Sequence, residues 1–155
     1  MPDLLIAGRL ERPLILGSTS RYRRELLSRL QLPFETVSPE VDETPLSGET
    51  PYDLSLRLAR AKAEAIAAQH PGTWIIGSDQ AAVNGSRILG KPHTIERATE
   101  QLKDASGKSV SFLTGLCLLN SQSGEAQVDC VPFTVHFRDL DEARIRRYLE
   151  IEQPF

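Results

Sequence analysis

An apolar run passes into small residues and then into a basic segment in Leu14-Ile15-Leu16-Gly17-Ser18-Thr19-Ser20-Arg21-Tyr22-Arg23-Arg24-Glu25-Leu26-Leu27. The pattern predicts a strand over about Leu14–Leu16 and a helix from about Ser20 to Leu30. Backbone N–H groups at a helix start have no partners inside the helix, and the helix dipole is positive there. Small residues let a ligand approach that backbone, and neighbouring arginines favour phosphate as the ligand. The stretch therefore predicts a phosphate-binding turn between a strand and a helix.

The basic segment also has a plainer interpretation. Arg21, Arg23 and Arg24 fit a solvated helix face, with Tyr22, Leu26 and Leu30 forming an apolar face at helical spacing. The preceding Gly-Ser-Thr-Ser turn favours the anion site. The segment is not a P-loop, because the Gly-Lys-Ser/Thr ending is absent.

Length and composition set the broad class. The 155 residues predict one domain, Met1–Phe155, with a sizeable core, and 40% apolar with 25% charged residues is usual for a globular protein. A net charge of −3 argues against a general nucleic-acid binder, because lysine and arginine contacts to phosphates dominate that affinity. Local basic residues are therefore expected to act as a site, and no stable nucleic-acid binding is expected.

Cysteine usage and the N-terminus bear on the compartment. Cys117 and Cys130 are far apart and lack Cys-x-x-Cys spacing, so they predict neither a disulfide scaffold nor a zinc site, although a cross-strand disulfide stays as an alternative. A reducing cytoplasm is the simplest interpretation. The N-terminus lacks a basic segment followed by a long apolar run, and no stretch approaches the roughly 20 apolar residues of a membrane helix. We expect neither a signal peptide nor a membrane partner.

A second helix has the clearest start signal in the chain. Thr50 is a good N-cap, Pro51 suits the first helical position, and Asp53 stands where a capping box has an acid. His70-Pro71-Gly72 is expected to end the helix. The apolar stripe is expected at Leu54, Leu58, Ala61, Ala65 and Ala68.

The rest of the chain continues to alternate between strands and helices. Trp74–Gly77 predicts a buried strand, Asn84-Gly85 indicates a hairpin, and Thr94 is expected to cap a helix that Ser106-Gly107 closes. Paired strands are expected over Val110–Leu119 and about Gln127–Arg138, before a helix that begins at Asp139 or Asp141. The pattern predicts an α/β domain with a mixed twisted sheet flanked by helices.

Asp79 has two interpretations of about equal weight. It follows the apolar strand, so it is either a turn-forming residue that caps the strand end or a partly desolvated carboxylate that activates water or holds a metal. The Gly17–Ser20 turn and Ser78-Asp79 each follow a predicted strand, where ligands tend to bind in α/β sheets. The two segments are therefore expected to be neighbours in space.

Three further charged residues are candidates, each with a plainer alternative. Lys62 and Lys91 are either surface lysines or phosphate ligands, and Glu43, in the acidic segment Ser38–Glu49, is either solvated or a ligand for Mg²⁺. The histidines show no metal-ligand spacing, so no zinc site is predicted.

Several motifs in fixed order resemble the Maf-like nucleotide pyrophosphatases. The opening segment Gly17–Leu27 is followed by Glu40-Val41-Asp42-Glu43-Thr44, Arg57-Leu58-Ala59-Arg60-Ala61-Lys62-Ala63, Ile75-Ile76-Gly77-Ser78-Asp79-Gln80, Gly90-Lys91-Pro92, Ser106-Gly107 and Thr114-Gly115. The chain is most similar to the branch that hydrolyses 7-methyl-GTP. The resemblance implies a Maf/ITPase-like α/β fold and hydrolysis of a nucleoside triphosphate to the monophosphate and pyrophosphate with a divalent metal, Mg²⁺ or Mn²⁺.

The resemblance also implies roles for individual residues. Asp79 matches the family's proton acceptor, and Tyr22 and Gln80 match positions that set base specificity, where the dTTP/UTP-cleaving branch has Arg and Thr. The phosphate- and metal-site positions of the family match Ser18, Arg23, Glu43, Lys62 and Lys91. Because 7-methylguanine is cationic, an aromatic face at Tyr22 would attract it, and an arginine would repel it.

Three expectations follow from the resemblance and its limits. The family continues beyond Gln153-Pro154-Phe155 with a glycine-rich segment, so we expect this chain to lack the family's C-terminal segment. A homodimer is expected by analogy. The alternatives are a dTTP/UTP pyrophosphatase and a non-catalytic nucleotide-binding module.

Overall fold

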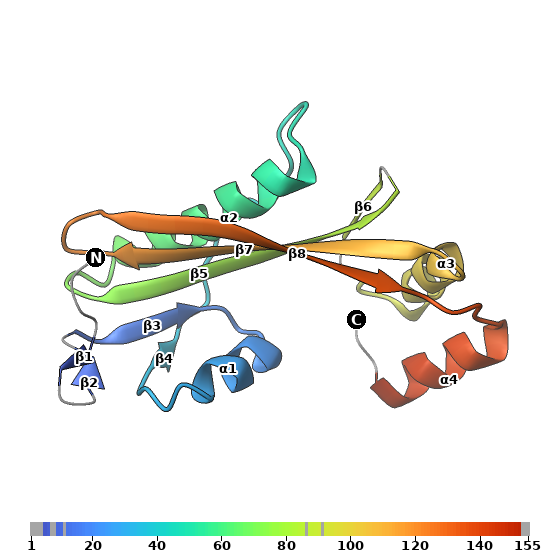
Figure 1. The fold of residues 1–155 in the computed structure, drawn as a ribbon, viewed down its shortest axis with the longest axis horizontal. Coiled ribbons are helices and arrows are strands. Elements are labelled where there is room, and N and C mark those ends of the chain that lie inside the picture. The colour runs from blue at the N-terminus through green and yellow to red at the C-terminus, as the bar shows by residue number, and fades with distance from the viewer. Residues whose placement is uncertain (1–4, 7–8, 11, 86, 91, 153–155) are drawn as a thin grey trace. The chain divides into compact units, whose positions relative to one another are not determined.

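The computed structural model describes residues 5–6, 9–10, 12–85, 87–90 and 92–152. Along the chain the elements are β1 (Leu5–Ile6), β2 (Arg9–Leu10), β3 (Leu14–Gly17), α1 (Arg21–Ser28), β4 (Glu35–Thr36), α2 (Pro51–Ala67), β5 (Trp74–Asn84), β6 (Arg87–Leu89), α3 (Ile95–Ala105), β7 (Ser109–Asn120), β8 (Ala126–His136) and α4 (Glu142–Glu152) (Figure 1). Among the described helices, none combines the length and apolar character that a bilayer span requires.

A six-stranded mixed sheet organises these elements. The strand order is β4-β3-β5-β7-β8, and β6 pairs with β5 beside this path. β3 is parallel to both β4 and β5, with Ile15 opposite Glu35 on one side and Ile75 on the other, whereas β5 and β6 are antiparallel. The two parallel connections each contain a helix, because parallel neighbours need a crossover connection between them. The expected mixed α/β fold is confirmed.

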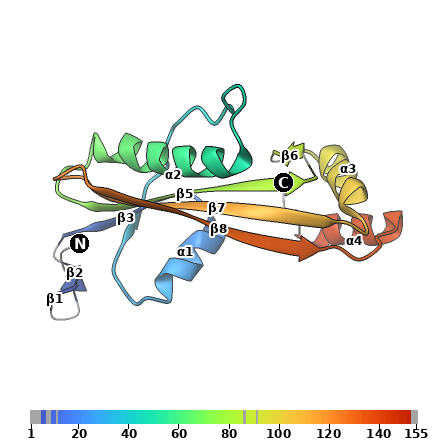
Figure 2. The same ribbon diagram turned by 45° about the horizontal axis from the view of Figure 1, so that its top comes forward.

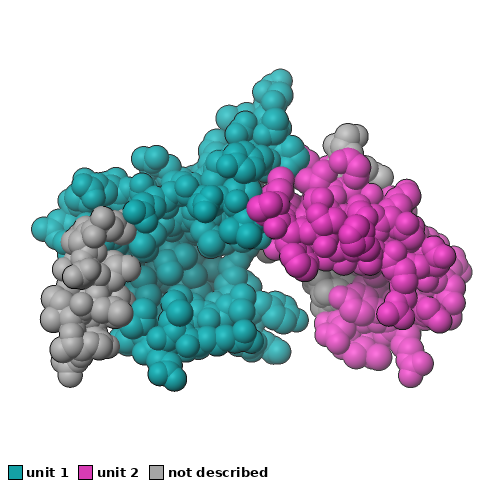
Figure 3. Space-filling model, viewed as in Figure 1, with its two compact units in different colours: residues 1–79, 114–131 teal, residues 80–113, 132–155 magenta. Residues whose placement is uncertain are grey.

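The chain forms two compact units (Figure 3). The first comprises Met1–Asp79 and Thr114–Val131, and the second comprises Gln80–Leu113 and Pro132–Phe155. β5, β7 and β8 contribute residues to both units. The assignment of the whole chain to one domain stays a prediction.

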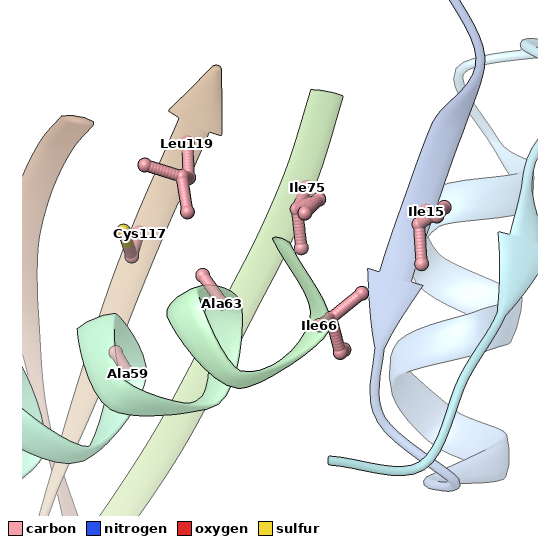
Figure 4. Packing of buried hydrophobic residues seen from close by; sticks show 7 residues of the cluster. All are labelled: Ile15, Ala59, Ala63, Ile66, Ile75, Cys117 and Leu119. Carbon is pink, nitrogen blue, oxygen red and sulfur yellow. The ribbon is translucent and has the colours of Figure 1, made fainter. Parts of the chain in front are cut away.

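The core of the first unit lies between α2 and the sheet. Figure 2 shows α2 and α1 on opposite faces of β3 and β5. Buried side chains from α2 meet those of three strands, as Figure 4 shows for Ile15, Ala59, Ala63, Ile66, Ile75, Cys117 and Leu119. Small residues dominate the helix side of this cluster, so α2 packs close to the sheet.

The second unit has its own smaller core, where α3 and α4 pack together. Ala98 from α3 contacts Ile145 and Leu149 from α4. The side chain of Thr94 accepts a hydrogen bond from the Arg97 amide and caps α3, as predicted. Asp141 accepts from the Arg144 amide at 2.8 Å, which identifies the later of the two expected starts for the last helix.

Two predicted apolar faces are wrong in detail. α1 ends at Ser28 and buries none of its residues, and Tyr22, Leu26 and Leu30 are 70%, 58% and 62% exposed. In α2 the capping by Thr50 and the burial of Leu54 and Leu58 are confirmed, but the buried face then follows Ala59, Ala63 and Ile66. The cause is Gly77 in β5, against which Ala59 and Ala63, the small side chains of the helix, fit.

The predicted end of the strand before Asp79 is also wrong. β5 continues without a break from Trp74 to Asn84, and only then turns through Gly85 into β6, as the hairpin signal predicted. Asp79 is therefore a mid-strand residue, and it is 7% exposed. The strand pair β1 and β2 was not predicted, because two-residue strands carry no periodic signal.

Candidate active site

The side chain of Lys62 stands between two carboxylates. Its Nζ lies 2.8 Å from Oε1 of Glu43 and 3.0 Å from Oδ1 of Asp79. The Lys62 and Asp79 side chains are 12% and 10% exposed, whereas the Glu43 side chain is 59% exposed. The Lys62–Asp79 pair is thus the sheltered part of the cluster, and Glu43 faces solvent.

A close approach of α2 to β5 brings these residues together. Gly77 and Asp79 point to the same face of β5, because side chains alternate along a strand. A Cβ atom on Gly77 would lie 2.1 Å from the carbonyl oxygen of Ala59 and 2.9 Å from the amide nitrogen of Ala63. Only glycine permits this spacing, and Lys62 is the neighbour of Ala63 in the helix. The glycine therefore sets the depth at which Lys62 meets Asp79.

The turn after β3 supplies a second set of polar groups. The hydroxyl of Ser18, which is 6% exposed, accepts from the Ser20 amide at 3.0 Å and from Nη1 of Arg23 at 3.4 Å. Ser20 is the N-cap of α1 and accepts from the Arg23 amide at 3.3 Å. The turn therefore holds an arginine side chain close to the first backbone N–H groups of a helix, as an anion site would require.

Arg23 is electrostatically part of the same cluster as Lys62. Burial lowers the pKa of its guanidinium below its ordinary value, while the charges of Asp79 and Glu43 act in the opposite direction. Because an arginine stays protonated at neutral pH, the site contains a partly dehydrated cation. An anion that reaches Arg23 would meet less competition from water than at an exposed arginine.

The acidic segment that carries Glu43 is tied to α2 by Arg57. Nε and Nη2 of Arg57 donate to the two carboxylate oxygens of Glu49 at 2.7 and 3.0 Å, and Nη2 also donates to the carbonyl of Thr44 at 3.1 Å. Asp42 accepts from the Thr44 amide at 3.0 Å. The segment therefore has a defined position on the helix although it contains neither helix nor strand.

The donor set fits a hard divalent cation that is completed by a substrate. The Glu43 and Asp79 carboxylates converge on one cationic atom, and Mg²⁺ is commonly held by one or two carboxylates together with phosphate oxygens. No group of three His, Cys, Asp or Glu side chains within the described residues forms a metal cage. The arrangement suits a metal that arrives with a phosphate ligand.

The structure brings most of the predicted site residues together. Ser18, Arg23, Glu43, Lys62 and Asp79 all belong to the first compact unit. Hydrogen bonds and ion pairs join Ser18 to Arg23 and Lys62 to Glu43 and Asp79, and the charges of Asp79 and Glu43 act on Arg23. Tyr22 is exposed on α1, one residue before Arg23. Gln80 follows Asp79 in β5, is exposed and falls in the second unit. Lys91 lies outside the described residues.

Sequence reasoning missed two features near this site. The two-pronged ion pair between Arg57 and Glu49 was not predicted. An acid immediately before the Thr50 cap and an arginine two turns into the helix could have indicated it. The hydroxyl of Ser78, which is 2% exposed, has no hydrogen-bond partner among the described residues. No sequence pattern marks such a group.

The chain is similar in sequence to a known family of proteins. Residues 13–155 match the family model described as Maf-like protein. A 7-methyl-GTP pyrophosphatase of Pseudomonas syringae pv. tomato is 64% identical over 142 residues, which cover 92% of this chain and 74% of that protein. Proteins of the same name from Pseudomonas aeruginosa and Alcanivorax borkumensis are 64% and 56% identical over 91% of this chain, and 73% and 72% of their own lengths are covered.

A solved structure gives only a distant likeness. Protein VC0702 from Vibrio cholerae aligns with a TM-score of 0.46 and 11% identity over 91% of this chain and 71% of that one. A likeness at this level supports no argument about function.

Proposed function

The chain belongs to the Maf-like family, and from this premise we propose that it hydrolyses 7-methyl-GTP to 7-methyl-GMP and pyrophosphate. The observation that carries the proposal is the pair of carboxylates on Lys62 beside the Ser18–Arg23 turn, in a chain 64% identical to a 7-methyl-GTP pyrophosphatase. Cations for a triphosphate and a carboxylate for a water molecule are the parts that such a reaction needs.

The triphosphate is expected to bind at the turn after β3. The backbone N–H groups at the start of α1 and the guanidinium of Arg23 donate hydrogen bonds to phosphate oxygens, and the ammonium of Lys62 adds a second positive charge. Lys91 is assigned to the same role by resemblance. These groups orient the nucleotide and balance the charge that develops on the leaving pyrophosphate.

Asp79 is assigned to the attacking water. Lys62 occupies its Oδ1, so Oδ2 is the oxygen that accepts a proton from water. The water attacks the α-phosphorus, the bond from that phosphorus to the bridging oxygen of the β-phosphate breaks, and pyrophosphate leaves. General-base assistance of this kind contributes about 10²–10⁴-fold to a rate.

Glu43 is assigned to a divalent metal, Mg²⁺ or Mn²⁺. When bound, such an ion neutralises charge on phosphate oxygens. Because Glu43 is largely exposed, it can exchange the Lys62 contact for another cation without burying a charge. Lys62 would then keep its contact with Asp79.

Tyr22 is assigned to the base. Tyr22 is 70% exposed and precedes Arg23 in α1, so a nucleotide held at Arg23 has its base within reach of this residue. A 7-methylguanine ring carries a delocalised positive charge, and an aromatic face attracts a cation by about 0.5–2 kcal/mol. Gln80 is assigned to base specificity by resemblance alone.

A substrate panel tests the proposal. Pyrophosphate release is measured for 7-methyl-GTP, GTP, dTTP and UTP with Mg²⁺ or Mn²⁺, alongside the Pseudomonas syringae relative. The proposal expects the highest kcat/KM with 7-methyl-GTP. A preference for dTTP and UTP would assign the chain to the other branch, and binding without metal-dependent pyrophosphate release would make it a non-catalytic module.

A further inference from the structure

The Arg57 side chain spans the acidic segment at two points. Its guanidinium makes a two-pronged contact with the Glu49 carboxylate and a third hydrogen bond to the Thr44 carbonyl. The Glu49 side chain is only 8% exposed, while the Arg57 side chain is 32% exposed. A planar guanidinium fits a carboxylate in this fork, and a lysine cannot reproduce it.

The fork also completes a set of hydrogen bonds inside the segment. The Leu46 amide donates to Oε1 of Glu49 at 3.1 Å, and the Glu49 amide donates to the Leu46 carbonyl at 3.0 Å. Residues 42–48 are all exposed, so burial of apolar surface contributes little to holding them. Polar contacts are therefore what orders this segment, and Arg57 makes three of them.

Glu43 directly precedes Thr44 in the acidic segment, so the position of the segment also determines where Glu43 lies. Thr44 is anchored on Arg57 and Glu43 on Lys62, and these two side chains start five residues apart on α2. Five residues correspond to about 7.5 Å along a helix, which two long side chains can bridge to neighbouring residues of one loop. The position of Glu43 on Lys62 thus depends on the Thr44 anchor.

We propose that Arg57 is a positioning residue that, through Glu49 and Thr44, holds the acidic segment on α2 so that Glu43 stays on Lys62. The inference rests on the proposed pyrophosphatase function for its kinetic consequence, but the anchoring itself does not. Among the described contacts, Arg57 makes no hydrogen bond or ion pair with Lys62 or Asp79, and the charge of Asp79 is the smallest influence on the pKa of Arg57, so its main action is through the segment.

The charge states of Arg57 and Glu49 favour their two-pronged ion pair at neutral pH. Hydrogen bonds from Arg57 first, and then from the Leu46 amide, hold the pKa of Glu49 below its ordinary value of 4.5. The pKa of Arg57 is raised, with the Glu49 hydrogen bond as the largest cause. Both partners are therefore charged throughout the range in which the enzyme would be assayed.

The test compares Arg57→Gln and Arg57→Lys with Arg60→Gln. Arg60 is the matched control, because it lies on the same helix and also pairs with a glutamate, Glu64, at 2.8 Å, in an exposed pair outside the acidic segment. Two quantities are measured: kcat and KM for 7-methyl-GTP, and amide hydrogen exchange of residues 42–49 in the ligand-free protein.

Loss of the anchor is expected to lower kcat by roughly 10- to 100-fold with little change in KM, since small misplacements of reacting groups have effects of this size. Exchange at residues 42–49 should accelerate, while the rest of α2 keeps its protection. Arg57→Lys should behave like Arg57→Gln, because it retains the charge but not the fork. Arg60→Gln should match the wild type in both quantities.

Two results would overturn the inference, and two further outcomes have their own readout. Wild-type kcat and unchanged exchange in Arg57→Gln would overturn it, and full rescue by Arg57→Lys would show that charge alone matters. If Arg57→Gln does not fold, Glu49→Gln breaks the fork from the loop side and must give the same two effects. If the wild type releases no pyrophosphate, the proposed function fails, while the exchange measurement still decides the anchoring.

Discussion

Gly77→Ala is expected to damage stability and catalysis together. The added Cβ would lie 2.1 Å from the Ala59 carbonyl oxygen, 2.9 Å from the Ala63 amide nitrogen and 3.0 Å from the Ala63 Cβ, whereas ordinary contacts begin at 3.4 Å. All three atoms belong to α2 and cannot rotate away as the end of a side chain can. The helix must therefore retreat from β5 by about 1 Å, because close-packed interiors leave no room to absorb the methyl group.

The size of the effect follows from this displacement. Overpacking of this kind costs about 1–3 kcal/mol, and each kcal/mol lowers Tm by about 2–4 °C in a chain of this size. A fall in Tm of about 2–12 °C is expected. Because α2 carries Lys62, its contact with Asp79 should lengthen from 3.0 Å, and kcat should fall by up to about 100-fold.

Gly17 and Gly90 provide controls for Gly77→Ala with progressively smaller expected effects. A Cβ on Gly17 would first meet Cδ1 of Ile66 at 2.6 Å, a side-chain end that can move, so Gly17→Ala should have a smaller effect on Tm. A Cβ on Gly90 would meet nothing within 4 Å, so Gly90→Ala should leave Tm unchanged. Thermal unfolding followed by circular dichroism gives Tm, and pyrophosphate release gives kcat. A Gly77→Ala protein with wild-type Tm and kcat would refute the argument that this glycine sets the helix depth.

Two substitutions and the buried thiol of Cys117 give further definite expectations. Tyr22→Ala should lower the preference for 7-methyl-GTP over GTP by roughly 2- to 30-fold in kcat/KM, because the cation–π attraction is lost, and an unchanged preference would remove Tyr22 from the base site. Thr50→Ala should cost about 1 kcal/mol in urea unfolding, because the Asp53 amide loses its capping acceptor at 3.1 Å, and unaltered stability would show that the cap is dispensable. Cys117 and Cys130 are buried free thiols, and burial raises the pKa of Cys117 above its ordinary value of 9.0. Thiol reagents should therefore label the native protein far more slowly than the urea-unfolded protein. The stability that the neutral Cys117 thiol contributes is complete below pH 9.0 and declines as pH rises through the raised pKa, so rapid native labelling or rising stability there would contradict its burial.

Local chemistry made much of the fold predictable. Thr50 and Thr94 cap helices because a hydroxyl can accept from an amide three residues on, and no distant residue is needed. Gly85 turns a hairpin because it adopts a positive φ of 66°, which other residues rarely adopt. Such signals are complete within four or five residues, so the sequence alone predicts them.

The site residues could be proposed individually, but their geometry could not. Lys62 and Asp79 are separated by 17 positions and meet only because Gly77 admits α2, a fact that no local pattern contains. The same holds for Arg57, whose partner Glu49 lies in a segment without periodicity. The position of Asp79 within an unbroken strand was missed, because its neighbours Ser78 and Gln80 resemble a turn in composition.

The wrong apolar face of α1 has a related cause. Helical spacing of Tyr22, Leu26 and Leu30 identifies a stripe but not what covers it, and all three side chains are exposed. Exposure of Tyr22 is consistent with its assigned contact with a base.

Replacement of Asp79 by asparagine tests the central claim most directly, because the side chain keeps its size but loses its negative charge and its basicity. Pyrophosphate release from 7-methyl-GTP is measured together with nucleotide affinity. The account predicts turnover lower by about 10²–10⁴-fold with affinity within a few fold of the wild type. Full turnover in Asp79→Asn would contradict it and would leave the Lys62–Asp79 pair with a structural role only.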